Sequence, residues 1–165
     1  PFADRFRYHL LRKRPGIIWA DTDAYCLRPF TPKDGYYFSW EDDHQGSVSN
    51  GVLALPADSP ALAELIAYTS DEYAVLPWLP PRMLDIACRR TTGEIEHALE
   101  RDVLYPVRYA DRRRFFRKAR MTWEHITPNT QSIHLYGRRI RSRLAADYDG
   151  VPPRGSILSA AVLFR

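Results

Sequence analysis

The chain has 165 residues, of which 45% are hydrophobic and 13% aromatic, and its formal net charge is +4. This composition is typical of a globular protein and excludes the disordered class, and the length favours one domain. No apolar run approaches the ~18 residues that a membrane-spanning helix needs. The basic charge suits anionic partners such as nucleotide sugars, phospholipid headgroups or nucleic acid, without choosing among them.

Residue spacing predicts a mixture of helices and strands. A first helix is expected over 2–14, ending at Pro15-Gly16, and the apolar run 17–20 is expected to be a buried strand. The remaining expectations, in chain order, are strands at 25–30, 36–40 and 47–55; helices at 60–73, capped by Ser59, at 81–90 and at 92–101; a buried strand at 103–106; a short helix capped by Asp111; a strand at 131–136; and a helix at 156–164.

Two carboxylates, Asp21 and Asp23, follow the predicted strand 17–20 directly. Side chains alternate along an extended segment, so we expect both to point the same way. Convergent carboxylates suit a hard divalent cation, Mn²⁺ or Mg²⁺, and such a cation commonly holds a diphosphate. Ligands of open α/β sheets bind beyond the carboxyl ends of strands, where these acids fall. The alternative is a pair of solvated turn carboxylates.

The first predicted helix places Asp4, Arg7 and Tyr8 along one edge. A carboxylate beside a guanidinium can grip vicinal hydroxyls, one accepting and the other donating hydrogen bonds. The alternative is a surface ion pair between Asp4 and Arg7, worth well under ~1 kcal/mol.

The segment 3–30 resembles the signature of glycosyltransferases that contain the Asp-x-Asp sugar-binding region. These are relatives of the yeast initiating mannosyltransferases, of the α-1,4-galactosyl- and N-acetylglucosaminyltransferases, and of bacterial capsular polysaccharide transferases. The residues that carry the resemblance are Ala3-Asp4-Arg5-Phe6-Arg7-Tyr8, Leu10-Leu11, Gly16-Ile17-Ile18-Trp19-Ala20-Asp21-Thr22-Asp23 and Cys26-Leu27-Arg28-Pro29. The one departure is Pro15-Gly16, where the family has Gly-Gly.

The resemblance implies a GT-A-type, Rossmann-like α/β fold and a single catalytic domain over 1–165. It implies metal-dependent transfer of a sugar from a UDP- or GDP-sugar to a glycan, lipid-linked or polysaccharide acceptor, with retention of anomeric configuration. Asp4 and Arg7, with Tyr8 beside them, would contact the donor sugar. Asp21 would touch the ribose or sugar and approach the metal through water, and Asp23 would ligate the metal.

Later segments resemble the same family. Asn50 would line the donor and acceptor cleft, although a turn residue is an equal alternative. His134 and Tyr136 match a closing His-x-Trp strand: His134 would be a third protein ligand of the metal or lie against the diphosphate, and Tyr136 would keep an aromatic face for the sugar or base. A core histidine is the alternative for His134. Thr91 and Thr92 match an acceptor-side Thr-Gly-Pro turn weakly, and a helix cap is the better interpretation.

The family domain normally starts with a β-α-β portion that holds the nucleotide base, and this portion precedes the first helix seen here. Because the chain also lacks an initial Met, we expect a part of a longer protein that binds donor poorly by itself. Cys26 and Cys88 lack metal-ligand spacing, which favours reduced thiols and a cytoplasmic protein.

Arginine clusters occupy 112–120 and 138–143. They lack interleaved stacking aromatics, so we expect a solvated face or a surface for lipid headgroups or phosphate, with peripheral membrane contact, and no nucleic acid. Two rival functions remain. A phosphatase of the haloacid dehalogenase type also uses Asp-x-Asp but wants Thr or Val where Tyr25 stands. A degenerate, non-catalytic relative would bind sugar or a membrane surface.

Overall fold

The computed structural model describes residues 2–42, 46–71, 83–90, 93–118 and 124–163. The chain forms two compact units. Unit 1 comprises Pro1–Asp21 and Phe30–Glu100, and unit 2 comprises Thr22–Pro29 and Arg101–Arg165. Each unit has a hydrophobic core of its own. The first boundary between the units falls inside the Asp-x-Asp motif, and the expectation of one catalytic domain stays a prediction.

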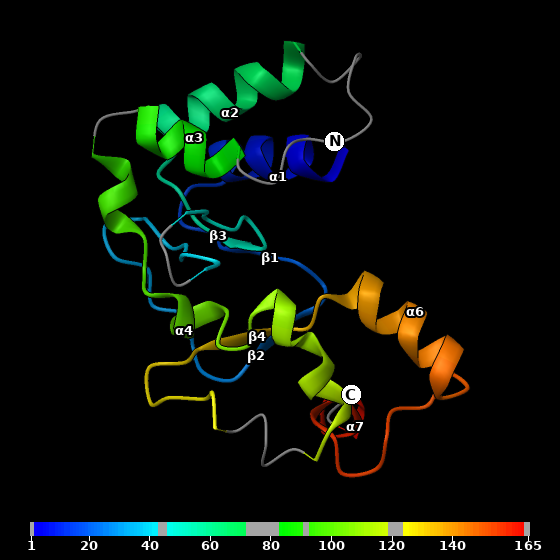
Figure 1. Cartoon of the computed structure of the whole chain (residues 1–165). Helices are drawn as coiled ribbons and strands as arrows, with labels where there is room; N and C mark the ends of the chain where they lie inside the picture. Colours follow the sequence, from blue (N-terminus) through cyan, green and yellow to red (C-terminus); the bar gives the residue numbers. More distant parts are fainter. Residues whose placement is uncertain (1, 43–45, 72–82, 91–92, 119–123, 164–165) are drawn as a thin grey trace. The chain divides into compact units, whose positions relative to one another are not determined.

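Three helices form one side of unit 1: α1 (Phe2–Lys13), α2 (Pro60–Asp71) and α3 (Met83–Arg90). Helix α2 packs against both α1 and α3 (Figure 1). Tyr8 and Leu11 supply the buried face of α1, which joins the core that includes Leu62 and Leu65 of α2. The predicted cap is confirmed, because Ser59 Oγ accepts a hydrogen bond from the Leu62 N–H at 3.1 Å.

The sheet of unit 1 is smaller than the sequence predicted. Strand β1 (Trp19–Ala20) pairs antiparallel with β3 (Val52–Leu53), with Trp19 opposite Leu53. The expected buried strand over 17–20 is therefore wrong in length and in burial: Ile17 and Ile18 are unpaired and half-buried, and Ala20 is exposed. The expected strands over 36–40 and 47–55 contribute β3 and isolated bridges such as Tyr37–Ala54 and Trp40–Val48.

Unit 1 ends with a short 3-10 helix, η1 (Glu94–His97), where a longer helix over 92–101 was expected. Glu94 itself is buried, and its carboxylate accepts hydrogen bonds from Ser59 Oγ, from the Ala61 N–H at 2.7 Å and from Tyr36 OH at 3.1 Å. This carboxylate therefore closes the amino end of α2 from a distant part of the sequence.

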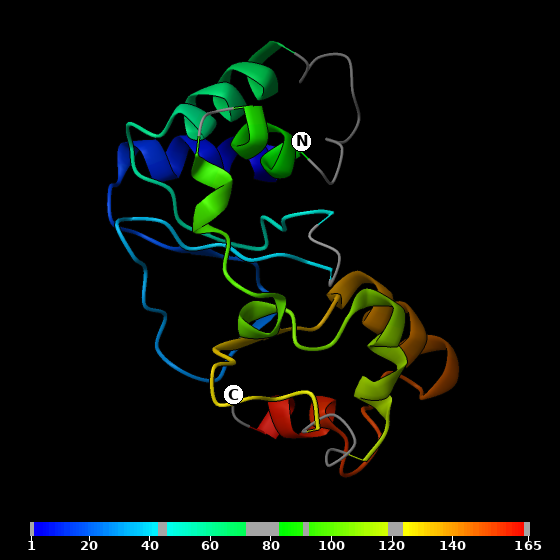
Figure 2. The ribbon, with the colours of Figure 1, turned by 60° about the vertical axis from the view of Figure 1, so that its left-hand side comes forward.

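Unit 2 is built on strand β2 (Ala24–Cys26), which pairs antiparallel with β4 (Ser132–His134). Its helices are α4 (Arg101–Leu104), the 3-10 helix η2 (Tyr109–Phe116), α6 (Gly137–Asp147) and α7 (Ile157–Leu163). Helix α4 packs on β4, and α7 packs on η2 (Figure 2). Strand β4 and helix α7 confirm the expectations for 131–136 and 156–164 in position and type.

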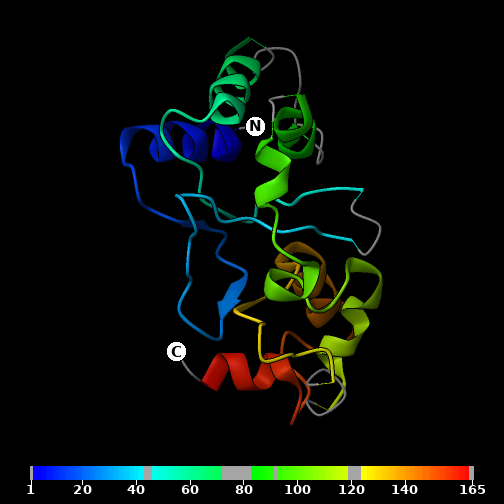
Figure 3. The same ribbon diagram turned by 90° about the vertical axis from the view of Figure 1, so that its left-hand side faces the viewer.

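Two expectations in unit 2 are wrong and one helix was not foreseen. The segment 103–106 is not a strand: it completes α4, and the Tyr105 N–H donates to the Arg101 carbonyl at 2.7 Å. Asp111 does not cap η2, which begins after Arg108; its carboxylate instead accepts from Arg108 Nε at 3.0 Å. Helix α6 follows β4 directly (Figure 3) and was not predicted.

The described residues thus combine helices with two small antiparallel sheets, each of two strands. The Rossmann-like GT-A arrangement stays a prediction. In the described ranges, no helix combines the length and the apolar character that crossing a membrane requires.

Candidate metal and sugar site

The first cluster of predicted site residues lies in unit 1 around Arg7. Helix α1 places Asp4 and Arg7 one turn apart, and residue Arg7 is only 5% exposed. Its guanidinium donates to Asp21 Oδ1 at 3.1 Å and to the Asn50 carbonyl oxygen, and it lies 3.7 Å from Asp4 Oδ1. Two carboxylates and a carbonyl therefore surround one buried guanidinium. Burying this charged group without such partners would be costly.

The Asn50 side chain connects this charge network to Tyr8. Its amide donates to Asp4 Oδ1 at 3.2 Å and to Tyr8 OH at 3.1 Å. Burial raises the pKa of Tyr8 to about 12, against the opposing effect of the Asn50 hydrogen bond, so the phenol stays neutral. Asp4 and Asn50 are partly exposed, whereas Arg7 and Tyr8 are buried. In this structure, a sugar that approached the network from solvent would contact Asp4 and Asn50 before Arg7 and Tyr8.

Asp21 ends β1 with its carboxylate turned toward α1. Its Oδ1 accepts from Arg7 and from Trp19 Nε1, the latter at 2.7 Å, and its backbone N–H donates to the Gly51 carbonyl at 2.7 Å. No hydrogen bond from the described residues reaches Oδ2. Asp21 is thus oriented by hydrogen bonds to Oδ1, and Oδ2 is available to a ligand.

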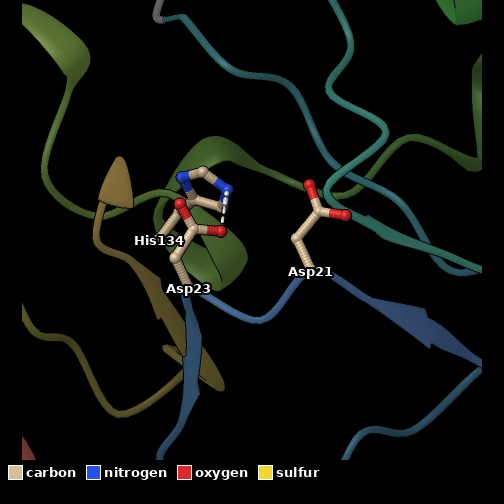
Figure 4. Close-up of side chains that lie close together, drawn as sticks. All are labelled: Asp21, Asp23 and His134. Carbon is tan, nitrogen blue, oxygen red and sulfur yellow. Dashed lines mark ion pairs between the residues drawn. The ribbon is translucent and has the colours of Figure 1, made fainter. Parts of the chain in front are cut away.

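The second cluster lies in unit 2, where the pairing of β2 with β4 brings Asp23 to His134. Residue Ala24 is opposite His134 in the ladder, and the Leu135 N–H donates to the Asp23 carbonyl at 2.8 Å. The imidazole Nε2 lies 3.3 Å from Asp23 Oδ1, and Figure 4 shows the two groups facing one another. The sequence resemblance implied this partnership, and the ladder supplies it.

The carboxylate of Asp23 is also bound by the start of α6. The Gly137 N–H donates to Asp23 Oδ2 at 2.6 Å. The His134 hydrogen bond is the main cause that lowers the pKa of Asp23 to about 2; burial opposes it and the Gly137 N–H assists it. Asp23 is therefore an anion at every physiological pH, which a metal ligand must be.

The absence of a side chain at Gly137 accommodates this close approach. A Cβ at this position would lie 3.1 Å from Asp23 Cβ and Oδ2 and 3.3 Å from an Arg141 nitrogen. Gly137 was not predicted as a site residue; its one signal in the sequence was a glycine directly after the predicted strand.

The His134 ring has a defined tautomer. Its Nδ1 accepts a long hydrogen bond from the Tyr136 N–H at 3.4 Å, so the ring proton of neutral imidazole is on Nε2 and points to Asp23. A cation bound at Nε2 would need this proton to move to Nδ1. The 3.4 Å bond would then be lost, at small cost because it is long.

Tyr136, a predicted sugar or base contact, is held inside unit 2. It has φ of 52° and is 8% exposed, and its hydroxyl donates to the Val107 carbonyl at 2.9 Å. Its ring meets Tyr109 edge-on at 5.3 Å and packs near Phe115. The contact with a sugar stays a prediction.

Within unit 2, Asp23 and His134 offer a carboxylate and an imidazole that could hold a metal ion (Figure 4). Asp21 belongs to unit 1, and its expected part in this site stays a prediction. Only Thr22 separates the two aspartates, so the backbone keeps their Cα atoms within about 7 Å of one another. Two carboxylates and one imidazole suit Mn²⁺ and, through the oxygens, Mg²⁺.

Not all predicted residues can be placed. Thr91 and Thr92 lie outside the described residues. Trp19 was not singled out as a site residue, although its indole N–H orients Asp21 and its ring lies 5.0 Å from the Arg7 guanidinium carbon. Its position two residues before Asp21 on an extended segment, hence on the same face, was the available signal.

Comparison with known proteins gives no relative for this chain. No protein-family model matches the sequence, and neither curated proteins nor solved structures give a match. A functional assignment therefore depends on the chemistry of the residues described above.

Proposed function

We propose that this protein is a metal-dependent glycosyltransferase that uses a UDP- or GDP-sugar. The observation that supports this most is the Asp23–His134 pair, in which His134 Nε2 lies 3.3 Å from Asp23 Oδ1, two residues after the anchored carboxylate of Asp21. A GT-A-type fold, a glycan, lipid-linked or polysaccharide acceptor and a peripheral membrane location belong to the same proposal.

Asp23 and His134 would hold Mn²⁺ or Mg²⁺, with Asp21 contributing through its second oxygen. When bound, such a cation supplies Lewis-acid neutralisation of the charge that develops on a departing diphosphate. The chain's own part is to keep Asp23 ionised, through His134 and the Gly137 N–H, and to orient Asp21 through Arg7 and Trp19.

The network of Asp4 and Asn50 would receive hydroxyl groups of the donor sugar. Asp4 offers acceptor oxygens and Asn50 offers an amide, and both are partly exposed at the edge of buried Arg7. The described residues do not identify an enzymic nucleophile. Front-face attack by the acceptor hydroxyl, with the leaving phosphate as base, is consistent with retention of configuration through an oxocarbenium-like state.

A non-catalytic sugar-binding relative is the second candidate. The burial of Arg7, 5% exposed, and of Tyr8, 0% exposed, favours it, since both side chains already have internal partners. In that case the network around Arg7 would stabilise unit 1 and only its rim would touch a ligand.

Donor hydrolysis with Mn²⁺ separates the two candidates. A panel of UDP- and GDP-sugars is incubated with this chain and with any longer natural protein that contains it, and free nucleotide diphosphate is measured. A transferase hydrolyses at least one donor, and Asp23→Asn lowers the rate by about a hundredfold, as loss of metal-assisted charge neutralisation implies. Asp149→Asn, the same change at an exposed acid of unit 2, is the matched control.

Binding of a donor without hydrolysis would favour the second candidate. Failure of both proteins to bind any donor would contradict both.

A further inference from the structure

A basic cavity of about 290 Å³ lies in unit 2, and its lining does not include the residues proposed to hold the metal. It is lined by η2 and by α6. Four arginines contribute to its wall, two from each helix, beside two apolar side chains: Arg112, Arg113, Arg139, Arg143, Phe116 and Ile140. The volume is near the lower limit of small-molecule sites.

The positive charge of this cavity is not balanced by the protein. Asp147 is the acid on the described wall, and it is already paired with Arg143 at 3.2 Å. In the described part of the chain, no carboxylate forms an ion pair with Arg112, Arg113 or Arg139. Like charges gathered around one hollow repel one another, and a bound anion would remove that repulsion.

Two of these arginines are held in place by Tyr109. The Tyr109 carbonyl accepts from Arg112 at 2.7 Å, and the Arg112 guanidinium carbon lies 4.1 Å from the Tyr109 ring centre. The Tyr109 hydroxyl accepts from Arg139 Nε at 3.0 Å. Part of the ordering cost of binding is therefore met before a ligand arrives.

We propose that this cavity binds the phosphate group of an anionic ligand. The planar fork of a guanidinium matches phosphate oxygens, and several arginines around one hollow favour a multiply charged anion over a single carboxylate. Phe116 and Ile140 give an apolar wall that suits the organic part of such a ligand. The recognised chemistry is the phosphate group itself, which lipid headgroups and soluble molecules share. The site is independent of the proposed metal centre.

The test has two arms, both in the presence of a chelator so that no divalent cation contributes. In the first, inorganic phosphate is titrated into the protein by calorimetry at low ionic strength. In the second, the protein is sedimented with phosphatidylcholine vesicles that contain or lack phosphatidylglycerol. Each arm uses the wild type and the double variant Arg113→Gln/Arg139→Gln. The control Arg12→Gln/Arg14→Gln makes the same charge change at exposed positions of unit 1.

We expect binding in at least one arm, weakened about tenfold or more in the cavity variant and less than about twofold in the control, because charge-assisted contacts are lost only in the former. Binding of phosphate in solution identifies a soluble ligand, and binding to anionic vesicles alone identifies a lipid headgroup. Tyr109→Phe, which keeps every charge and removes the hydroxyl that holds Arg139, should weaken the same binding severalfold.

Three results would overturn the proposal. The first is absence of binding in both arms. The second is an equal loss of binding in the cavity and control variants, which would indicate general attraction of anions to a basic protein. The third is preferential binding of a mixed-sequence oligonucleotide that the cavity variant retains. Circular dichroism of each variant verifies that it is folded.

Discussion

Replacing Arg7 with methionine should destabilise the protein by about 3 kcal/mol, the range expected when one partner of a buried ion pair is removed. The Arg7 side chain is 6% exposed and binds Asp21 Oδ1 at 3.1 Å, where the Asp21 side chain is 29% exposed. Water can reach Asp21 in part, which keeps the cost at the lower end of that range. Methionine has a similar length, so packing on the Trp19 ring is largely kept.

A double-mutant cycle isolates the Arg7–Asp21 interaction. Asp21→Asn should cost about 1 to 2 kcal/mol in the wild type and much less in the Arg7→Met background, which gives a coupling of about 1 to 2 kcal/mol. Unfolding in urea, followed by circular dichroism, provides the free energies of unfolding. Arg12→Met, on the exposed face of the same helix, is the control and should change stability by less than ~0.5 kcal/mol. If Arg7→Met is as mild as the control, or the two changes are additive, the network is a surface pair and this reasoning is wrong.

Three further predictions concern single carboxylates and the imidazole. Glu94→Ala should cost about 3 kcal/mol in urea unfolding, because two buried donors and one partly buried donor lose their acceptor, whereas Glu96→Ala should cost less than ~1 kcal/mol. The pKa of Asp23 is lowered in the folded protein from 3.8 to about 2, so this group stabilises the fold above pH 4 and loses that contribution as the pH falls toward 2. After allowance for solvent screening the loss is about 1 to 2 kcal/mol, and it should vanish in Asp23→Asn when acid unfolding is measured. Nitrogen NMR should place the proton of neutral His134 on Nε2 without metal and on Nδ1 after saturation with Zn²⁺, a diamagnetic substitute for Mn²⁺ that imidazole binds. An unchanged tautomer would show that His134 is not a ligand through Nε2.

Local signals predicted the parts of the fold that local physics determines. The apolar stripe and the Pro15-Gly16 stop predicted α1, and Ser59 predicted the start of α2. The strand around His134 was predicted from alternation and resemblance, and β4 occupies that position. In each case the residues that specify the element are neighbours in the sequence.

The errors arise where distant contacts decide the structure. Val103 and Tyr105 have strong β preference, but residues 101–104 close a helical turn. The Val103 carbonyl accepts a hydrogen bond at 2.8 Å from the N–H of Gln131, which is far along the chain. The arginine-rich α6 was not predicted because its apolar stripe consists of only Ile140 and Leu144, which stand among charged residues in the sequence. Glu94 was not identified from the sequence, yet it caps α2.

The sequence placed Asp4, Arg7 and Tyr8 along one helix edge and assigned Asn50 separately to the expected cleft. The structure joins all four by hydrogen bonds and an ion pair, while their role in binding a sugar stays a prediction. The sequence did not predict that the network would be so buried, because burial depends on how α1 and the segment before β3 pack together. The supporting roles of Trp19 and Gly137 likewise follow from three-dimensional contacts.

Metal binding by the unmodified chain is the most direct test of the proposed function. Electron paramagnetic resonance measures free Mn²⁺ as the protein is titrated, without any need for a sugar donor or for turnover. We predict saturable binding of one ion per chain, weakened about tenfold or more by Asp23→Asn and by His134→Ala and unchanged by Asp149→Asn. Free Mn²⁺ that stays constant throughout the titration, or binding that both site variants retain, would contradict the account.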